Sequence, residues 1–286
     1  SGTPFTVLPL MPLDIYFLGT GGGRFSMLTQ KRRTAGILLV HGETHVHVDP
    51  GPGALVYSNL ARLDPQNLEG IVVTHCHPDH YTDAEVLIEA MSHGTRTKRG
   101  LFAAPKSVLI GNSDYDRGVS RYHSNLPATV ETMKSGRSFG IDGLVLEAME
   151  ARHSETEGVG IRIRVPGVGD VGYTSDTGFF EGLSEQYRGL RILIACAMWP
   201  RWEHLRYHLN TEEVRIIVEK AKPGAVILTH FGMKMLNAEP GEEATYIEKE
   251  TGIPVVAAQD GMRVIVSDRI EVRSSRKCES PRIIDA

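Results

Sequence analysis

The sequence predicts a protein of the α/β class, of the α+β kind, in which two mixed β-sheets pack face to face with helices outside them. Three observations lead to this fold class. Short apolar runs with the composition of strands recur along the chain, helix–strand pairs occur in both halves, and hairpin-like pairs of strands lie between them. With 286 residues, of which 41% are hydrophobic, the chain is long enough to bury a sizeable core.

The expected strands are short apolar runs, and several alternate between apolar and polar or small residues as half-buried strands do. The segment 159–165, Val-Gly-Ile-Arg-Ile-Arg-Val, is the clearest, because its alternation places Arg162 and Arg164 on a solvent face. The predicted strands span residues 13–18, 37–40, 45–49, 70–74, 107–110, 144–148, 159–165, 169–174, 191–196, 225–229 and 262–266.

Three helices are expected between these strands. The first covers about 82–93, because polar residues open it and a glycine follows its last turn. The second begins at Asn210 and ends before a Pro-Gly pair, and the third covers about 242–250 and stops at Gly252.

The chain is expected to form one domain over residues 11–272, because no repeat, low-complexity segment or Pro/Gly/Ser-rich linker divides it. Met11 has the character of a natural start and runs directly into a strand, so residues 1–10 are expected to be an added or mobile extension. The polar segment 273–286 is expected to be a mobile extension at the other end.

Charge and cysteine content limit the classes of partner. A net charge of −4 excludes a protein-wide basic field for nucleic acid, so any RNA contact must be local. The three cysteines, Cys76, Cys196 and Cys278, are odd in number and widely spaced, and no secretion signal is evident, which predicts a reducing cytoplasm. No apolar run reaches the roughly 18 residues that span a bilayer, so no membrane partner is expected.

Residues 74–80, Thr-His-Cys-His-Pro-Asp-His, form the most informative segment. Imidazole and carboxylate are common ligands of zinc and other divalent metals, so this spacing predicts a metal site. The apolar run 70–73 comes just before it, which places these side chains at the C-terminal end of a strand, where α/β sites are usually built. Cys76 alternates away from His75 and His77 and is expected to have a packing role.

Four further polar residues each follow a strand-like run. A polar residue in this position is sometimes only a turn former. Four of them beside a metal motif nevertheless indicate one site assembled from several strand ends. These residues are His153, Asp176, His230 and Asp49.

With these motifs the chain resembles the metallo-β-lactamase superfamily. The order His-x-His-x-Asp-His, then His, Asp and His, matches the motifs of that superfamily over nearly the whole chain. The resemblance implies a four-layer αββα sandwich with a dinuclear metal site at the sheet edges. It implies that one metal is held by His75, His77 and His153 and the other by Asp79, His80 and His230, that Asp176 bridges the two, and that Asp49 orients a ligand from behind.

The resemblance also implies two divalent metal ions as cofactors. Zinc is the expected metal, and manganese, iron, cobalt and nickel suit the same ligand types. Two such ions about 3.5–4 Å apart generate hydroxide near neutral pH and stabilise charge on the attacking and leaving oxygens. Asp79 and Asp176 are therefore expected to be catalytic as well as ligands.

Finer features resemble the ribonuclease Z-like and related phosphodiesterase branch. They are Leu-Gly-Thr-Gly-Gly-Gly at 18–23, Arg-Arg-Thr at 32–34, Thr-His-Phe-Gly at 229–232 and Gln-Asp-Gly-Met at 259–262. Gly21, Gly22 and Gly23 are expected to let backbone amides approach an anionic group of the substrate.

His208 is the remaining candidate catalytic residue. It lies just before an expected helix, and related phosphodiesterases carry a histidine in a similar short element near the metals. An imidazole there would position the phosphate or protonate the leaving alkoxide. The alternative is a histidine that only packs at a helix N-terminus.

The residues predict a metal-dependent hydrolase, and the resemblance implies a dinuclear site and a phosphodiester substrate, either RNA or a small nucleotide or cyclic diester, and allows a homodimer. Two alternatives stay open: an acyl hydrolase of the thioesterase, lactonase or glyoxalase II kind, and a non-catalytic RNA- or protein-binding member. The stretch 95–140 holds no long tRNA-gripping arm, but it carries basic residues that would form a local rim, namely Arg96, Lys98, Arg99, Lys106, Arg117 and Arg121.

Overall fold

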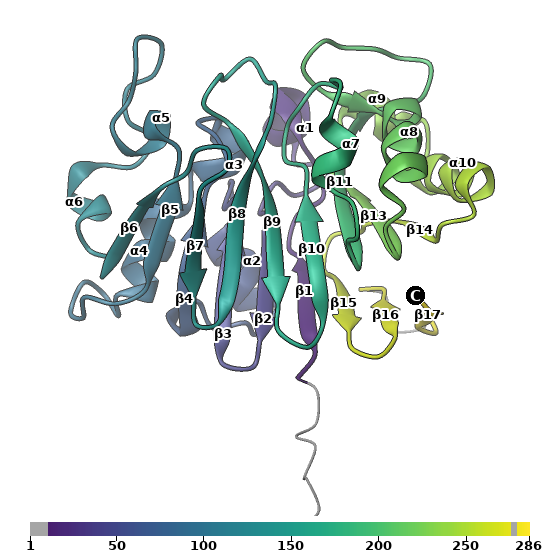
Figure 1. The fold of residues 1–286 in the computed structure, drawn as a ribbon. Helices are drawn as coiled ribbons and strands as arrows, with labels where there is room; N and C mark the ends of the chain where they lie inside the picture. Colours follow the sequence, from purple (N-terminus) through teal and green to yellow (C-terminus); the bar gives the residue numbers. More distant parts are fainter. Residues whose placement is uncertain (1–10, 276–278) are drawn as a thin grey trace, which may run out of the picture.

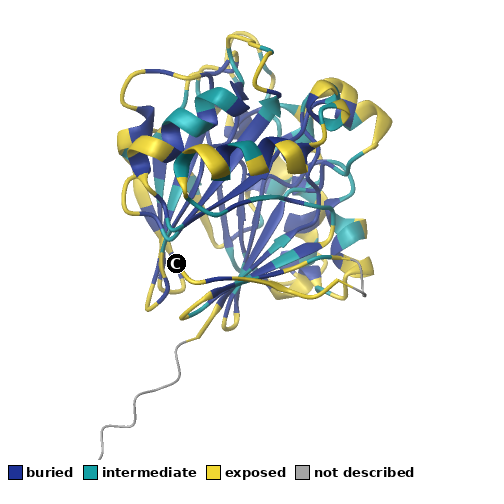
Figure 2. Cartoon of the chain, turned by 90° about the vertical axis from the view of Figure 1, so that its right-hand side faces the viewer, coloured by how far each residue is buried: buried dark blue, intermediate teal, exposed yellow. Residues whose placement is uncertain are grey.

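Two β-sheets pack face to face with helices on their outer sides in the computed structural model, which describes residues 11–275 and 279–286 (Figure 1). In Figure 2 the buried residues gather along the strands and on the helix sides that face them, while the outer helix sides are exposed. This arrangement confirms the predicted fold class and its four αββα layers. The extension predicted at residues 1–10 lies outside the described residues.

The first sheet is mixed and has nine strands in the described part of the chain. In spatial order they are β17 (Arg282–Ile284), β16 (Ile270–Arg273), β15 (Met262–Val266), β1 (Leu13–Phe17), β2 (Ile37–His41), β3 (Thr44–Val48), β4 (Leu68–Val72), β5 (Leu101–Ala104) and β6 (Thr129–Thr132).

The second sheet is also mixed. In spatial order its strands are β14 (Val255–Ala257), β13 (Ala225–Thr229), β11 (Ile192–Trp199), β10 (Gly169–Tyr173), β9 (Val159–Val165), β8 (Leu144–Glu150) and β7 (Ser138–Ile141), and the short β12 (Leu209–Asn210) pairs with β11 off this path.

The helices connect the strands and cover the sheets. They are α1 (Gly23–Thr29), α2 (Ala54–Leu60), α3 (Pro78–Tyr81), α4 (Ala84–Met91), α5 (Lys106–Leu109), α6 (Arg121–Ser124), α7 (Leu183–Gln186), α8 (Thr211–Ala221), α9 (Met233–Asn237) and α10 (Pro240–Thr251), with a 3₁₀ turn at Pro65–Asn67. The expected helix start at Asn210 is confirmed, because Asn210 and Glu213 form a reciprocal capping box at the beginning of α8.

Three apolar clusters hold the layers together. The largest lies between the sheets and joins side chains such as Ile15 and Val264 of the first sheet to Ile161 and Ile194 of the second. A second cluster packs α7, α8 and α10 on the second sheet, and a third packs α2 and α4 on the first. Burial of this kind is the main favourable term in folding, so both sheets are fixed from two sides.

The strand directions bring distant parts of the chain to one edge of the sandwich. In the first sheet β3 and β4 are parallel. In the second sheet β10, β11 and β13 are parallel, and β8 points the same way because β9 is antiparallel to both β8 and β10. The segments that leave the C-terminal ends of β3, β4, β8, β10 and β13 carry the candidate site.

The strand predicted at 107–110 is wrong. Residues Lys106–Leu109 form the helical turn α5, with Pro105 as its N-cap, and the strand is the preceding run Leu101–Ala104, which is buried throughout. A short apolar run carries no periodicity that separates a buried strand from a buried helical turn.

The C-terminal segment 273–286 is not a free extension over its whole described length. Residues Arg282–Ile284 form β17, which pairs antiparallel with β16 and extends the first sheet. The Arg282 guanidinium also pairs with the Glu248 carboxylate of α10 at 2.8 Å. Backbone pairing and one ion pair thus hold a segment whose polar composition gave no sign of a strand. In the described ranges, no helix has both the length and the apolar character needed to cross a membrane.

Candidate metal centre

The motif at 74–80 is divided between two kinds of backbone. His75 and His77 lie on the extended segment after β4, whereas Asp79 and His80 lie on α3, which begins at Pro78. Proline suits the first position of a helix, because its fixed φ matches the helix and its missing N–H would have no partner there. The proline therefore turns the chain between the two halves of the motif, so that each half faces a different group of side chains.

The first group joins His75 and His77 to His153, which follows β8. Nδ1 of His77 lies 3.1 Å from Nε2 of His75 and 3.1 Å from Nε2 of His153. One ligand atom from each of these three residues and one from Asp176 lie within 4.8 Å of one another.

The second group joins Asp79 and His80 to His230, which follows β13. Nε2 of His80 lies 3.1 Å from Nε2 of His230, and Oδ2 of Asp79 lies 3.5 Å from the same His230 atom. Both groups therefore consist of imidazole nitrogens and carboxylate oxygens, the donors that zinc and related metals take in proteins.

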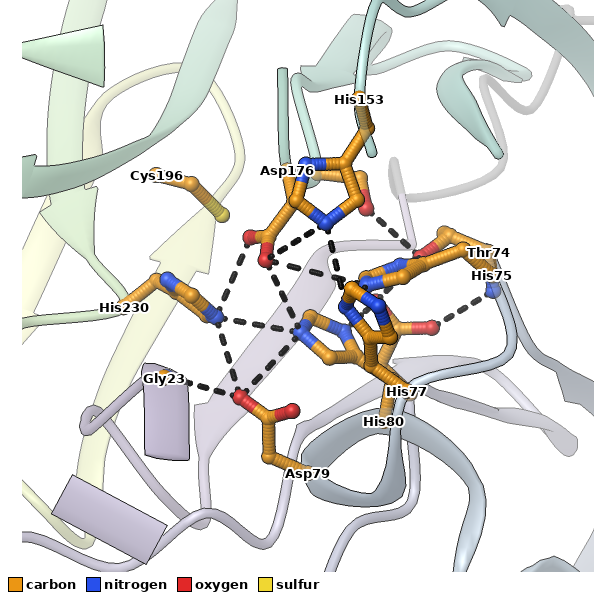
Figure 3. A network of polar contacts seen from close by, with 12 residues as sticks. Gly23, Thr74, His75, His77, Asp79, His80, His153, Asp176, Cys196 and His230 are labelled. Carbon is orange, nitrogen blue, oxygen red and sulfur yellow. Dashed lines mark hydrogen bonds and ion pairs between the residues drawn. The ribbon is translucent and has the colours of Figure 1, made fainter. Parts of the chain in front are cut away.

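Asp176, at the end of β10, lies between the two groups (Figure 3). Its Oδ1 is 3.1 Å from Nε2 of His230, while its Oδ2 is 3.6 Å from Nε2 of His80 and 3.7 Å from Nε2 of His75. The carboxylate is buried, and Oδ1 has no hydrogen-bond partner. A buried carboxylate oxygen without a donor is costly unless a cation satisfies it, so this atom fits a bound metal.

The outward nitrogen of each of three histidines meets a hydrogen-bond acceptor. Nδ1 of His80 donates to Asp49 at 2.8 Å, Nδ1 of His153 donates to the Tyr207 carbonyl at 3.1 Å, and Nδ1 of His75 contacts the Thr74 hydroxyl at 3.2 Å. Because a neutral imidazole carries one proton, these contacts leave the Nε2 lone pairs facing the centre. This is the arrangement that ligand histidines need.

Asp49 accepts hydrogen bonds from several residues behind His80. Its carboxylate accepts from the backbone N–H of Thr74 at 2.7 Å, from the Thr74 hydroxyl at 2.8 Å and from the Tyr173 hydroxyl at 3.0 Å, in addition to His80. Asp49 is buried and takes a left-handed φ of 53°, as Ser175 and His230 do with 52° and 61°. Such strained positions persist only where the surrounding structure fixes them.

Burial and neighbouring carboxylates set the charge of the clustered histidines. Burial lowers the pKa of His75, His77 and His153, so these rings are neutral in their ordinary range. Burial also opposes the charged form of His80, but the carboxylates of Asp79, Asp49 and Asp176 outweigh it and hold its pKa well above the usual value. The three carboxylates thus favour a positive charge at this position of the centre.

Comparison with known protein families decides the identity of the fold. The model of the β-lactamase superfamily domain matches residues 44–231, a stretch that holds all seven clustered side chains. The chain belongs to the metallo-β-lactamase superfamily.

Relatives place it in the ribonuclease Z-like branch of the superfamily. The uncharacterized protein MJ1374 of Methanocaldococcus jannaschii is 39% identical over 256 residues, which cover 89% of this chain and 95% of the relative. The ribonuclease Z of Thermococcus kodakarensis is 25% identical and covers 87% of this chain and 93% of the relative. Among solved structures, the metallo-β-lactamase fold protein YhfI of Bacillus subtilis has a TM-score of 0.71 at 18% identity, over 89% of this chain and 99% of that one.

His208 lies at the rim of this metallo-β-lactamase centre, as the sequence predicts. Its Nδ1 is 3.7 Å from Oδ2 of Asp176, and its ring stacks beside that of His230 with centroids 6.2 Å apart. The side chain is 15% exposed, so it closes the centre while one side still meets solvent. Burial lowers the pKa of His208 to about 4, against the opposing effect of Asp176, which makes the ring neutral near pH 7.

The prediction that the Gly21–Gly23 amides bind substrate is wrong for these backbone groups. The N–H of Gly21 donates to the Arg33 carbonyl, that of Gly22 to the Phe231 carbonyl, and that of Gly23 to Oδ2 of Asp79 at 2.8 Å. The glycines are small for another reason, because a Cβ on Gly22 would lie 2.2 Å from the His230 ring. Their role is to hold Asp79 and make room for His230.

Sequence reasoning missed several side chains that support the centre. The Tyr115 hydroxyl lies 3.2 Å from Nε2 of His77, and the Cys196 sulfur lies near Asp176 and His230. Burial raises the pKa of Cys196 well above its usual value, so it is a neutral thiol. Cys76 packs in the core of the first sheet's outer side as predicted, and burial raises its pKa to about 11. Neither Cys196 nor Tyr115 lies in a pattern that marks it in the sequence.

Proposed function

We propose that this chain is a hydrolase of phosphodiesters that works with two divalent metal ions. The observation that carries the proposal is the position of Asp176 between the two groups of three side chains: its Oδ1 lies near His230, and its Oδ2 lies near both His80 and His75. A carboxylate shared in this way suits a pair of metal ions at the short spacing that phosphoryl transfer uses. The ribonuclease Z relatives share the branch and supply the phosphodiester as substrate class.

The donor atoms of the two groups suit one metal ion each. His75, His77 and His153 would hold one ion, Asp79, His80 and His230 the other, and Asp176 both. Two such ions supply a water activated near neutral pH and stabilise charge on the attacking and leaving oxygens of the ester. Zinc is the metal that this set of imidazoles and carboxylates favours first.

The chain's own residues orient and enclose the reaction. Asp49 fixes the His80 ring through a 2.8 Å hydrogen bond, and the Gly23 amide fixes the Asp79 carboxylate. His208 is neutral near pH 7, so its ring N–H is suited to donate a hydrogen bond to a phosphoryl oxygen rather than to deliver a proton from a cationic ring. We assign His208 as the residue that positions the phosphate.

The remaining expectations belong to the same proposal. They are a single domain over residues 11–272, to which β17 is added at the C-terminal end, a cytoplasmic protein, an RNA or nucleotide diester as substrate and a homodimer as the working form. The seven clustered side chains and the ribonuclease Z relatives support the substrate class, and the unpaired Cys76 and Cys196 suit the cytoplasm.

The test compares ester classes on one preparation. Protein stripped with a chelator and reloaded with zinc or manganese is assayed with bis(p-nitrophenyl) phosphate and with thioester and lactone substrates. Asp176→Ala should lose most diester turnover, by at least about a hundredfold, and at least one bound ion. Asp268→Asn, an exposed carboxylate in the turn between β15 and β16, should retain both. Acyl turnover without diester turnover would overturn the proposal.

A further inference from the structure

A pocket of about 540 Å³ lies beside the candidate metal centre and has no part in holding the metals. It is formed by the start of α5, the residues that follow β6, and the loop that follows β8 and leads into β9. Because β5 and β6 run parallel to β4, their C-terminal ends lie at the same sandwich edge as the metal motif (Figure 1). The volume of the pocket is in the range that small-molecule and nucleotide sites have.

A single residue, Gly158, separates the pocket from the metal motif in space. Gly158 lines the pocket, and a Cβ on that glycine would lie 3.1 Å from the Cβ of His75. The wall between pocket and centre is rigid, because the buried Glu155 carboxylate accepts from the backbone N–H groups of Cys76 and Glu157. The pocket therefore keeps a fixed position beside His75.

The charged lining of the pocket consists of two lysines and two carboxylates, Glu150 and Glu157, and Glu150 is paired with Arg152. Lys106 and Lys134 both line it, and in the described residues neither ammonium group has a hydrogen bond or an ion pair. By contrast, two arginines of the 95–140 stretch are engaged: Arg99 pairs with Glu69, and Arg117 donates to the Val119 carbonyl at 2.8 Å. Two unpaired ammonium groups on one pocket suit a phosphate.

The rest of the lining suits a base. Met133 and Val159, which are only 2% and 3% exposed, lie at the floor of the pocket, and Glu157 contributes a carboxylate whose Oε2 is buried without any hydrogen-bond partner. A buried carboxylate oxygen calls for a donor. An exocyclic amino group, which adenine, cytosine and guanine carry and uracil lacks, is such a donor.

We propose that this pocket binds the nucleotide that flanks the scissile bond, with its phosphate on Lys106 and Lys134, its base against Met133 and Val159, and its amino group on Glu157. The inference rests on the proposed function, since it names the substrate of the same centre as an oligonucleotide or nucleotide diester. It also gives that centre a preference for a base with an amino group beside the cleaved ester.

Equilibrium binding tests the pocket apart from turnover. Isothermal titration of the metal-loaded protein with AMP should give binding that the double variant Lys106→Ala/Lys134→Ala weakens about tenfold or more. The matched control Lys98→Ala/Lys220→Ala removes two exposed lysines elsewhere and should leave the affinity within twofold. Turnover of bis(p-nitrophenyl) phosphate reports on the metal centre, and the control Lys98→Ala/Lys220→Ala should keep it at the wild-type rate.

The base is tested with Glu157→Gln. Wild-type protein should bind AMP about tenfold more tightly than UMP, and the variant should lose most of this preference because an amide both donates and accepts. AMP affinity unchanged in the lysine variant, or ribose 5-phosphate bound as tightly as AMP, would overturn the inference while leaving diester turnover intact. AMP binding that needs both lysines in a protein without diester turnover would instead support the pocket and contradict the proposed function.

Discussion

Nδ1 of His80 lies 2.8 Å from Oδ2 of Asp49, and this oxygen also accepts from the hydroxyls of Thr74 and Tyr173. The contact sets which His80 nitrogen carries the proton and turns Nε2 toward Asp79 and His230. Since both residues are buried, no water replaces the bond when it is lost. The orientation of His80 on α3 therefore depends on a carboxylate that follows β3, 31 positions earlier in the chain.

Asp49→Asn should accordingly weaken metal binding without removing any of the seven clustered side chains. An amide nitrogen in place of Oδ2 meets the donors of His80, Thr74 and Tyr173, so the His80 ring loses its fixed tautomer. We expect about a 10- to 100-fold loss of affinity for one of the two ions. Calorimetric titration of the stripped protein with zinc measures it, with Asp268→Asn as control. Unchanged affinity for both ions would show that Asp49 serves only the fold.

His208→Ala should raise KM for a diester and lower kcat, while metal content stays the same, because His208 contacts Asp176 only at 3.7 Å. We expect kcat/KM to fall about 10²- to 10⁴-fold, and His208→Gln to recover part of it by supplying an N–H donor. His204→Ala is the matched control, since its side chain is 70% exposed on the same loop. Kinetics equal to wild type in His208→Ala would support the packing alternative.

Tyr115→Phe should loosen the first group of ligands. The Tyr115 hydroxyl accepts from Nε2 of His77 at 3.2 Å, which leaves Nδ1 of His77 as the lone pair that faces His75 and His153. Without the hydroxyl we expect about tenfold weaker binding of one ion, a loss typical of residues behind a ligand. Zinc titration of this variant is compared with that of Tyr122→Phe, an exposed tyrosine nearby in sequence. Equal zinc affinity in both variants would contradict the assignment.

The convergence of the clustered side chains could be predicted because it depends on strand ends. His153, Asp176 and His230 each follow an apolar run, and parallel neighbours in a sheet bring such ends to one edge. The division of the 74–80 motif between two groups also follows locally from Pro78, which starts a helical turn.

Tyr115 could not be predicted, because its position depends on a loop rather than on a period. Asn112 folds this loop by accepting from the backbone N–H groups of Asp114 and Tyr115. That turn is one of several that a Gly-Asn-Ser segment can take. The prediction for the glycines at 21–23 is wrong for a similar reason. Glycines suit both an open anion site and a tight contact with His230, and only the tertiary structure distinguishes the two.

Acid sensitivity of the fold should come in part from His47. Its Nε2 donates to the Ala35 carbonyl at 2.9 Å, and its buried Nδ1 has no partner. Burial lowers the pKa of His47 to about 4, from an ordinary 6.5. The unfolded chain therefore takes up a proton as the pH falls below 6.5, while the folded chain does so only near 4.

Because the folded pKa of His47 lies below the unfolded one, the free energy of unfolding falls as the pH falls. Above pH 6.5 the ring is neutral in both states and costs nothing, and between pH 6.5 and 4 the free energy of unfolding falls by up to about 3 kcal/mol through this residue. His47→Gln keeps an N–H donor for Ala35 but does not titrate, so its unfolding free energy should fall about 2 kcal/mol less than that of wild type between pH 7.5 and 5. Urea unfolding across this range measures both slopes, with His204→Gln as control. Parallel slopes for wild type and His47→Gln would place the acid sensitivity elsewhere, in the histidines of the metal centre.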